Sequence, residues 1–389
     1  MANIIGLFST QNELLESFPK TKNYQTKELF EEYWDDFINY ADEKNYEIRP
    51  VVSKEIDKML KCKTPELGYS VYKCPECGNE AIVHNTCKSR ICSSCGLKYA
   101  KERTQTIMEH LHNCRHRHIT FTIPSILWPY FRKDRSLLNL LFQAVNEVLS
   151  SFFKKFKKNE NYKGGYILVL HTFGRDNKWN THIHALVAEM AMGDITAYKK
   201  VDFFPFELLR KSFQTVLLNL MEQKLGKDNF RSVKNKIYKD SNNGFYVRAI
   251  KEDYKDHSPK KIIEYVLRYC GRPAFASYRI LDISNNVVTF WYQRHEDDKF
   301  VVERIHVFEL ISRIIIHIPE FQFKTIRYYG FYNKKHKFCD MIKMLLDKEK
   351  IPFYRQLNTY RMLMLKSFDI DPLICNKCGT VMEFEVLIC

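Results

Sequence analysis

A closely spaced histidine pair is the first feature that could carry chemistry. His182 and His184 flank Ile183 in a segment rich in β-branched and apolar residues. Because side chains alternate along a strand, both imidazoles would lie on one face and Ile183 on the other. Two neutral imidazoles can hold a divalent ion when a neighbouring strand supplies a third ligand. A hairpin loop centred on residues 176–177 would place His171 opposite His182, so we expect His171 to be that ligand. Strand histidines that bind nothing are the alternative reading of the pair alone.

A tyrosine pair, Tyr265 and Tyr269, lies in a segment expected to be helical over residues 260–270. A spacing of four residues makes the two phenols neighbours on one helix face. Apolar residues of the same segment supply a packing stripe beside them, although core aromatic rings would show the same spacing. Beside a divalent ion that polarises a DNA phosphate, a phenolate could attack phosphorus and preserve the bond energy as a phosphotyrosine link. The second tyrosine would allow a second strand to be attacked before the first is released.

Two cysteine knuckles predict a structural metal site. Each is a CxxC pair followed by glycine, which presents two thiolates, and two such pairs complete the tetrahedral shell that zinc prefers. The expected ligands are Cys74, Cys77, Cys92 and Cys95. Cys87 is the alternate ligand, and Cys62 and His84 are also close enough in the sequence to replace one. In a reducing compartment the twelve cysteines are unlikely to form disulfides, which favours metal binding.

A third knuckle, Cys375 and Cys378, stands near the end of the chain without a second CxxC beside it. It is half a site, a remnant, or a pair that completes its ligand shell from elsewhere in the fold. The sequence leaves these three alternatives open.

Helices and strands alternate along the chain in a pattern that must position these groups. Helical spacing of apolar residues and capping signals predict helices over residues 28–40, 52–60, 134–156, 206–225 and 260–270. Short β-branched runs bounded by turn residues predict strands over residues 118–123, 166–172, 181–187, 278–283, 287–293 and 300–307. We therefore expect an α+β fold in which a central antiparallel sheet is flanked by helices. A small zinc-ribbon-like module and N-terminal helices would precede it.

Composition narrows the class of partner. The chain of 389 residues carries a net charge of +15, from 61 basic and 46 acidic residues, and such an excess favours nucleic acid. DNA contacts are expected from Lys88, Arg90, Lys98, Arg268 and Arg272. The first residues do not resemble a secretory signal, and the most apolar window, 311–318, is too short to span a bilayer. A cytoplasmic protein with no membrane contact is the expectation.

The ordered set of motifs resembles a known family, the two-tyrosine rolling-circle insertion-sequence transposases of the HUH endonuclease superfamily. The matching stretches cover residues 50 to 385 approximately. They are CKSRICSSCG at 87–96, RHITFTIP at 117–124, LHTFG at 170–174, HIH at 182–184, YVLRY at 265–269 followed by Arg272 and Pro273, RYYGFY at 327–332, and DPLIC at 371–375. Thr181 stands where the family pattern leads us to expect proline.

The resemblance implies a fold and an activity. The fold would be a five-stranded antiparallel sheet flanked by helices, with the histidine pair at its centre. The activity would be Mg²⁺- or Mn²⁺-dependent cleavage of single-stranded DNA at element ends in a bacterial or archaeal cell, close to the nucleoid. Cleavage would leave a 5′-phosphotyrosine and a free 3′-hydroxyl. By position, His182 and His184 would bind the metal, and Tyr265 and Tyr269 would be the nucleophiles.

These expectations divide the chain into an N-terminal helical region (1–66), a zinc-binding module (67–115), a catalytic domain (116–310) and a C-terminal region with the third knuckle (311–389). Two other functions are compatible with parts of the pattern. One is a plasmid replication initiator or relaxase, against which the zinc module and the segment at 327–332 argue. The other is a zinc-dependent DNA-binding protein without catalysis, which would have no need of the tyrosine pair.

Overall fold

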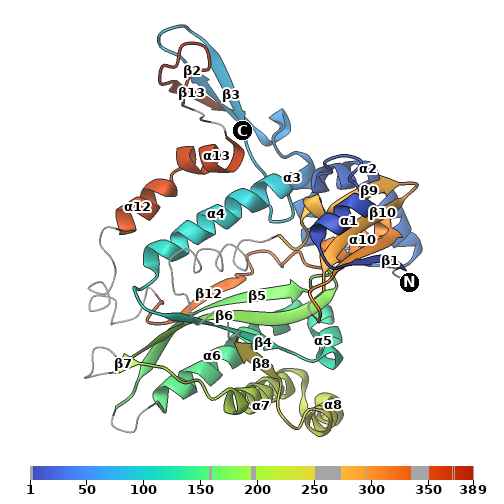
Figure 1. Ribbon diagram of the computed structural model, residues 1–389, viewed down its shortest axis with the longest axis vertical. Coiled ribbons are helices and arrows are strands. Elements are labelled where there is room, and N and C mark those ends of the chain that lie inside the picture. Colours follow the sequence, from blue (N-terminus) through green and yellow to red (C-terminus); the bar gives the residue numbers. More distant parts are fainter. Residues whose placement is uncertain are drawn as a thin grey trace.

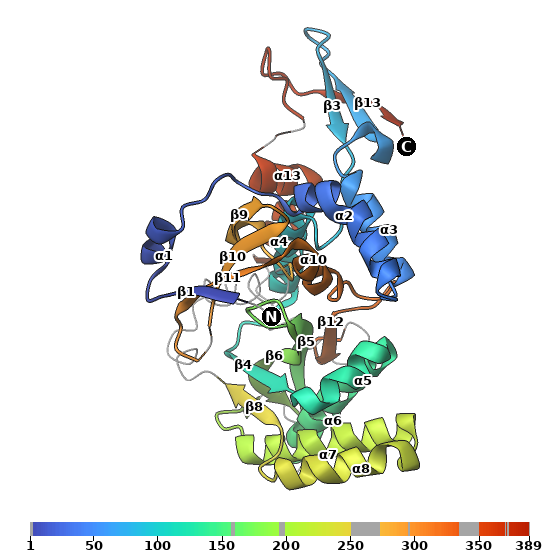
Figure 2. The ribbon, with the colours of Figure 1, turned by 90° about the vertical axis from the view of Figure 1, so that its right-hand side faces the viewer.

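The computed structural model describes residues 3–156, 160–193, 199–249, 273–294, 296–333, 350–369, 371 and 373–388. In these ranges the strands form three separate antiparallel sheets, and helices pack against the two larger ones. The expected α+β class is therefore confirmed. Figures 1 and 2 show the smallest sheet at one end of the long axis and helices α7 and α8 at the other. None of the helices in the described ranges is long and apolar enough to cross a membrane.

The largest sheet carries the histidines, and we call it the histidine sheet. Its strand order is β12-β5-β6-β4-β8, and the short β7 also pairs with β6. The strands are β4 (His116–Thr122), β5 (Lys163–Phe173), β6 (Trp179–Met192), β7 (Lys199–Lys200), β8 (Tyr246–Ala249) and β12 (Ile326–Gly330). The five-stranded path agrees with the expected sheet, and it places the histidine pair on β6, its central strand.

One face of the histidine sheet packs on amphipathic helices. Ile183 and Phe121 point to this side and join a fully buried apolar cluster with Leu141 and Phe213. The covering helices are α5 (Trp128–Lys133), α6 (Leu138–Lys154), α7 (Phe206–Leu225) and α8 (Lys227–Asp240), with short 3₁₀ turns at Ser125–Leu127 and Arg135–Leu137. Asp134, the first residue of the helix predicted over residues 134–156, accepts a hydrogen bond from the backbone N–H of Ser136 and so begins the turn that leads into α6.

Helix α4 (Ser93–His110) covers part of the opposite face, the one that carries the histidines. Ile107 and Met108 on α4 pack with Val169 of β5 and Leu186 of β6 in a separate buried cluster. The sequence analysis predicted no helix in this segment. Its apolar side chains follow helical spacing, and the sheet beneath them accounts for the helix.

A second sheet lies beside the first, with strand order β1-β11-β10-β9. Its strands are β1 (Asn3–Phe8), β9 (Ile280–Ser284), β10 (Val287–Gln293) and β11 (Phe300–His306). Helices α2 (Thr26–Glu43), α3 (Pro50–Leu60) and α10 (Val307–Ile315) share its buried core, while α1 (Gln11–Ser17) and a 3₁₀ turn at Ser277–Arg279 lie beside it. The expectation of a single central sheet was incomplete, because β9 to β11 pair with the N-terminal strand and not with the histidine strands.

The third sheet joins a hairpin from the first quarter of the chain to the last strand. Its order is β13-β2-β3, formed by β2 (Tyr69–Lys73), β3 (Glu80–His84) and β13 (Glu383–Ile388), with a 3₁₀ turn at Pro65–Leu67 leading into β2. Helices α12 (Lys350–Leu357) and α13 (Tyr360–Phe368) precede β13 and lie along α4 (Figure 1). Strands β12 and β13, from the expected C-terminal region, thus pair with strands of the expected catalytic domain and zinc-binding module.

Candidate metal centres and the histidine face

Three histidines converge on the face of the histidine sheet that α4 partly covers. In the β5–β6 hairpin His171 pairs directly opposite His182, which is the register predicted from the loop. His184 follows two residues later on the same face. One ring nitrogen from each of His171, His182 and His184 lies within 4.8 Å of the other two, an arrangement that could hold a metal ion.

The nitrogen geometry of the pair fits two neighbouring ligands of one ion. Nε2 of His182 and Nε2 of His184 are 3.0 Å apart. Two ligand atoms that are each about 2.1 Å from an octahedral ion and at right angles would be about 3.0 Å apart. The Nδ1 of His182 is 2.8 Å from the backbone oxygen of Asn180, to which an Nδ1–H donates, leaving the Nε2 lone pair for a metal.

A fourth histidine, His118 on β4, also belongs to this cluster. Its Nε2 is 2.9 Å from Nδ1 of His184, and the hydroxyl of Thr120 is 3.2 Å from the same Nε2. The sequence analysis placed His118 on a strand but gave it no role. The sequence pattern could have shown that His118 and Thr120 lie on the same face of their strand. It could not show that β4 pairs with β6, which brings this face beside His184.

Burial keeps His182 and His184 neutral. Desolvation lowers the pKa of His182 to about 4. The pKa of His184 is lowered well below its usual range, first by desolvation and then by the neighbouring imidazoles of His171, His182 and His118. Neutral imidazole is the form that binds a metal ion, so these two side chains are in their ligand state at neutral pH.

The predicted nucleophiles Tyr265 and Tyr269, together with Arg268 and Arg272, lie outside the described residues. The described chain on either side of them is close to the histidine face. Ala249, at the end of β8, pairs with Ile119, the neighbour of His118 on β4. Pro273, where the description resumes, lies against α4, since a Cβ on Gly96 would be 3.6 Å from its Cβ.

Eight of the nine cysteines in the described ranges form two clusters of four, and the structure separates the two knuckles that the sequence analysis had joined. Cys92 and Cys95 lie with Cys87 and Cys62, and all four are buried. The Sγ–Sγ distances are 3.6 Å for Cys62–Cys95, 3.4 Å for Cys87–Cys95 and 3.9 Å for Cys62–Cys92. Thiolates about 2.3 Å from a tetrahedral zinc ion would be about 3.8 Å apart, so this cluster fits zinc.

Cys74 and Cys77 lie instead with Cys375 and Cys378. A shared site for Cys74, Cys77, Cys92 and Cys95 therefore does not match the geometry. The reason is topological: the first knuckle forms the turn of the β2–β3 hairpin, and β3 then separates it from the second knuckle at the start of α4. Gly78 has φ +68° at this turn, whereas Gly96 is helical and close to the backbone oxygen of Arg90.

The expected DNA-contacting residues of the described ranges differ in exposure. Lys88 is exposed at a turn. Arg90 donates to the hydroxyl of Thr325 at 2.8 Å and stacks over the ring of Tyr99. Lys98 is half-buried, with its ammonium 4.8 Å from the ring centre of Tyr360 on α13. Lys88 is thus the one of these three that presents its charge to solvent.

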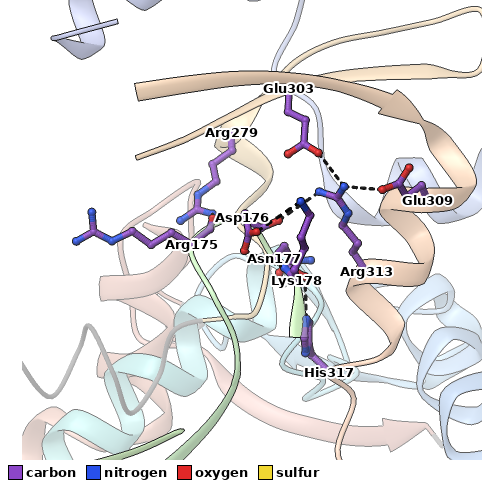
Figure 3. A network of polar contacts seen from close by, with 9 residues as sticks. All are labelled: Arg175, Asp176, Asn177, Lys178, Arg279, Glu303, Glu309, Arg313 and His317. Atoms are coloured by element: carbon purple, nitrogen blue, oxygen red, sulfur yellow. Dashed lines mark hydrogen bonds and ion pairs between the residues drawn. The ribbon is translucent and has the colours of Figure 1, made fainter. Parts of the chain in front are cut away.

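The tip of the β5–β6 hairpin is fixed to the second sheet by a polar network (Figure 3). Arg313 of α10 pairs with the buried Glu303 of β11 at 2.7 Å and with Glu309 at 2.5 Å, and it donates to the backbone oxygen of Asp176 at 3.4 Å. Arg279 donates to the backbone oxygen of Arg175 at 2.8 Å. These contacts hold the hairpin whose strands carry His171 and His182.

Comparison with known proteins identifies the class. A family model described as a putative transposase matches residues 165–338, which include the histidine hairpin. A second model, described as a transposase zinc-binding domain, matches residues 29–123, which include the Cys62, Cys87, Cys92 and Cys95 cluster. The chain belongs to the transposase family that combines these two parts, and as a transposase it is an enzyme that acts on DNA.

Two relatives cover most of the chain. The transposase for insertion sequence element IS801 of Pseudomonas savastanoi pv. phaseolicola is 27% identical over 361 residues, which are 88% of this chain and 85% of that protein. The putative transposase y4qJ of Sinorhizobium fredii (strain NBRC 101917 / NGR234) is 26% identical over 293 residues, which are 71% of this chain and 73% of that protein. No solved structure matches the chain.

Proposed function

We propose that this transposase cleaves and rejoins single-stranded DNA at the ends of its element through a 5′-phosphotyrosine intermediate. The observation that carries the proposal is the convergence of His171, His182 and His184 within 4.8 Å on adjacent strands. A DNA-binding module without catalysis has no need of such a cluster. The relatives that cover most of the chain are described as transposases, which also favours this function over a replication initiator or relaxase.

The three histidines would hold Mg²⁺ or Mn²⁺. The neutral state of His182 and His184 and the 3.0 Å spacing of their Nε2 atoms support this role. When bound, the ion supplies Lewis-acid polarisation of a phosphate oxygen. The cysteine cluster on Cys62, Cys87, Cys92 and Cys95 would hold zinc with a structural role, because all four positions are taken by protein thiolates.

Tyr265 and Tyr269 would be the nucleophiles. In the cleavage step, the phenol oxygen of one tyrosine gives up its proton and bonds to phosphorus, and the bond from phosphorus to the 3′-oxygen breaks. The 3′-oxygen takes up a proton and leaves as a free hydroxyl, while the 5′-phosphate stays on the tyrosine. Rejoining reverses these steps with a new 3′-hydroxyl. The positions of Ala249 and Pro273 support the proposal that the two tyrosines between them would come close to the histidine face.

The net charge of +15 supports a DNA substrate, and the exposed Lys88 would contact its backbone. Arg268 and Arg272, flanking the second tyrosine, would contact the phosphates near the cleaved bond. Arg90 and Lys98 would contribute to DNA binding only indirectly, because their side chains already contact Thr325 and Tyr360. The substrate would be met at the nucleoid, in the cytoplasm of a bacterial cell.

A covalent-adduct assay tests the proposal. The full chain is incubated with single-stranded DNA carrying an element end and Mn²⁺ or Mg²⁺, and the SDS-resistant protein–DNA adduct is measured. We expect an adduct with the wild type and none in excess EDTA. The double variant Tyr265→Phe/Tyr269→Phe should form no adduct and still bind DNA. The matched control is Tyr246→Phe, an exposed tyrosine on β8, which should leave the yield unchanged. Undiminished adduct in the double variant would refute the assignment.

The histidine role has a separate test. His182→Ala should lower cleavage strongly while the thermal unfolding curve keeps its wild-type shape, because the side chain lies at the partly exposed edge of the cluster. Wild-type cleavage in the presence of excess EDTA would contradict a metal-dependent step.

A further inference from the structure

The second cysteine cluster is built from two segments of the chain that are far apart in the sequence. Cys74 and Cys77 lie at the tip of the β2–β3 hairpin, and Cys375 and Cys378 precede β13. The Sγ–Sγ distances are 3.4 Å for Cys74–Cys378, and 3.6 Å for both Cys77–Cys375 and Cys77–Cys378. These values are near the edge of about 3.8 Å for a tetrahedral zinc–thiolate shell, and they far exceed a disulfide bond of about 2.05 Å.

The two halves of the cluster have the same backbone geometry. The N–H of Gly78 donates to the carbonyl of Cys74 at 3.0 Å, and the N–H of Gly379 donates to the carbonyl of Cys375 at 2.9 Å. The N–H of each first cysteine in turn donates to the carbonyl five residues on, at 2.9 Å in both halves. Gly78 and Gly379 both have positive φ, +68° and +75°. The two knuckles have the same shape and face each other, so their four thiols form a preformed set of metal ligands.

Asn79 joins the two halves of the cluster through its side chain. Its Nδ2 donates to the Oδ1 of Asn376 at 3.1 Å and lies 3.7 Å from the Sγ of Cys375. The two knuckles therefore contact each other beyond their sulfur atoms.

The third sheet has almost no other core. Its buried apolar cluster consists of Cys74, Cys375 and Met382, with Tyr72 and Ala81 packed against them. On β13 the side chains of Phe384 and Leu387 are exposed. A three-stranded sheet with so small a core needs another source of stability, and a structural metal ion is the usual one.

We propose that Cys74, Cys77, Cys375 and Cys378 bind a second structural zinc ion that fastens the C-terminal segment to the β2–β3 hairpin. Half of this site lies outside the residues matched by either family model. The other cluster lies within residues 62–95, so the two ions have different roles. One stabilises the start of α4, and the other connects two segments that are far apart in the sequence.

The second zinc site holds α12 and α13 in place where they cover α4. Arg355 of α12 pairs with Glu109 of α4 at 2.7 Å, and Asn358 donates to the hydroxyl of Thr106 at 3.3 Å. Lys101 of α4 donates to the backbone oxygen of Lys366 on α13. The pairs near the surface are individually weak. The zinc site that follows α13 therefore adds to the apolar contacts of Leu363 and Met364 in holding these helices on α4.

Cobalt substitution on the full chain tests the site. Co²⁺ bound by thiolates gives a sulfur-to-metal charge-transfer band, to which the histidine cluster contributes nothing. The wild type should show two thiolate-bound ions per chain by titration. Cys375→Ser/Cys378→Ser should show one, and Cys114→Ser, outside both clusters, should keep two. One ion in the wild type, or two in the double variant, would overturn the proposal, as would a disulfide found by mass spectrometry of the unreduced chain.

Hydrogen exchange tests whether the second zinc site holds α12 and α13 in place. In Cys375→Ser/Cys378→Ser the amides of α12, α13 and β2 should exchange faster, while those of β5 and β6 stay at the wild-type rate. Unchanged exchange in α12 and α13 would show that the ion does not hold these helices. Neither readout depends on DNA cleavage, so a failed tyrosine assignment would leave both results interpretable.

Discussion

His118 and His184 are joined by a contact of 2.9 Å between Nε2 of the first and Nδ1 of the second. The other ring nitrogen of His184 is 3.0 Å from Nε2 of His182. When that nitrogen faces an ion, the proton of His184 must sit on Nδ1, from which it donates to His118. His118 then fixes the tautomer and the ring orientation of a metal ligand without binding the metal, which makes it a positioning residue.

Removing this contact should weaken metal binding. We expect His118→Ala to lower the Mn²⁺ affinity by roughly 10- to 100-fold, a usual effect of losing an outer-shell partner. His118→Gln retains a side-chain acceptor and should recover part of the loss. Titration calorimetry measures both, with the unfolding temperature as a check on folding. Equal Mn²⁺ affinity in wild type and His118→Ala would rule out the positioning role.

The buried cysteine cluster should stabilise the region around α4. Cys87→Ser removes one of four buried thiolates, and we expect it to release zinc and to destabilise this region by on the order of several kcal/mol. Differential scanning calorimetry with and without a chelator measures the effect. The variant should melt at a lower temperature and respond no further to the chelator at this cluster. The control Cys114→Ser should melt close to the wild type; equal melting of Cys87→Ser would argue against a structural ion.

His317 should make the folded state sensitive to acid. Its Nε2 is 3.0 Å from the backbone oxygen of Asn177 and its Nδ1 is 3.0 Å from the hydroxyl of Thr172. A neutral ring satisfies both contacts, because Nε2–H donates and Nδ1 accepts, whereas a protonated ring would lose its acceptor. Burial, ahead of nearby arginines, lowers the pKa of His317 to about 3.

The direction of the effect follows from this lowered pKa. The unfolded chain takes up a proton near pH 6.5, but the folded protein does so only near pH 3. The stability from neutral His317 is therefore complete above pH 6.5 and declines as pH falls toward 3, by up to about 1.4 kcal/mol per pH unit. His317→Gln should flatten the dependence of unfolding free energy on pH in this range. The exposed His306→Gln serves as the control, and an unchanged slope in His317→Gln would contradict the argument.

The histidine site was largely predictable because its information is local. The strand period places His182 and His184 on one face, and a short polar loop fixes the register that brings His171 opposite His182. Helix α7, predicted over residues 206–225, has those bounds in the structure. His118 was missed because its contact depends on which strand pairs with β6, and local pattern does not carry that information.

The cysteine partners depend on the long-range fold. Cys375 meets Cys77 across 298 residues, and the knuckles at 74–77 and 92–95 look like one site when only their spacing is read. Strand β1 was missed for the same reason. It pairs with β11 at the other end of the sequence, and its exposed Ile4 and Leu7 give no clear amphipathic signal. The tyrosine pair lies outside the described residues, so its position stays a prediction.

Removing only one partner of the ion pair between Arg313 and Glu303 should strongly lower the free energy of unfolding. Glu303 is 0% exposed and Arg313 is 7% exposed. Arg313→Met leaves the Glu303 carboxylate buried without its partner, and we expect a loss of about 3–5 kcal/mol in unfolding free energy. Denaturant titration measures it. Arg294→Met, which breaks the exposed pair with Asp297, should cost less than about 1 kcal/mol. Similar losses in the two variants would show that burial does not govern the energetics here.

The identity of the nucleophile is the central claim, and mapping the covalent adduct tests it most directly. The wild-type adduct with single-stranded DNA is digested with nuclease and protease, and the residue that retains a nucleotide 5′-phosphate is identified by tandem mass spectrometry. The account predicts the modification on Tyr265 or Tyr269. A nucleotide attached to any other side chain would contradict it.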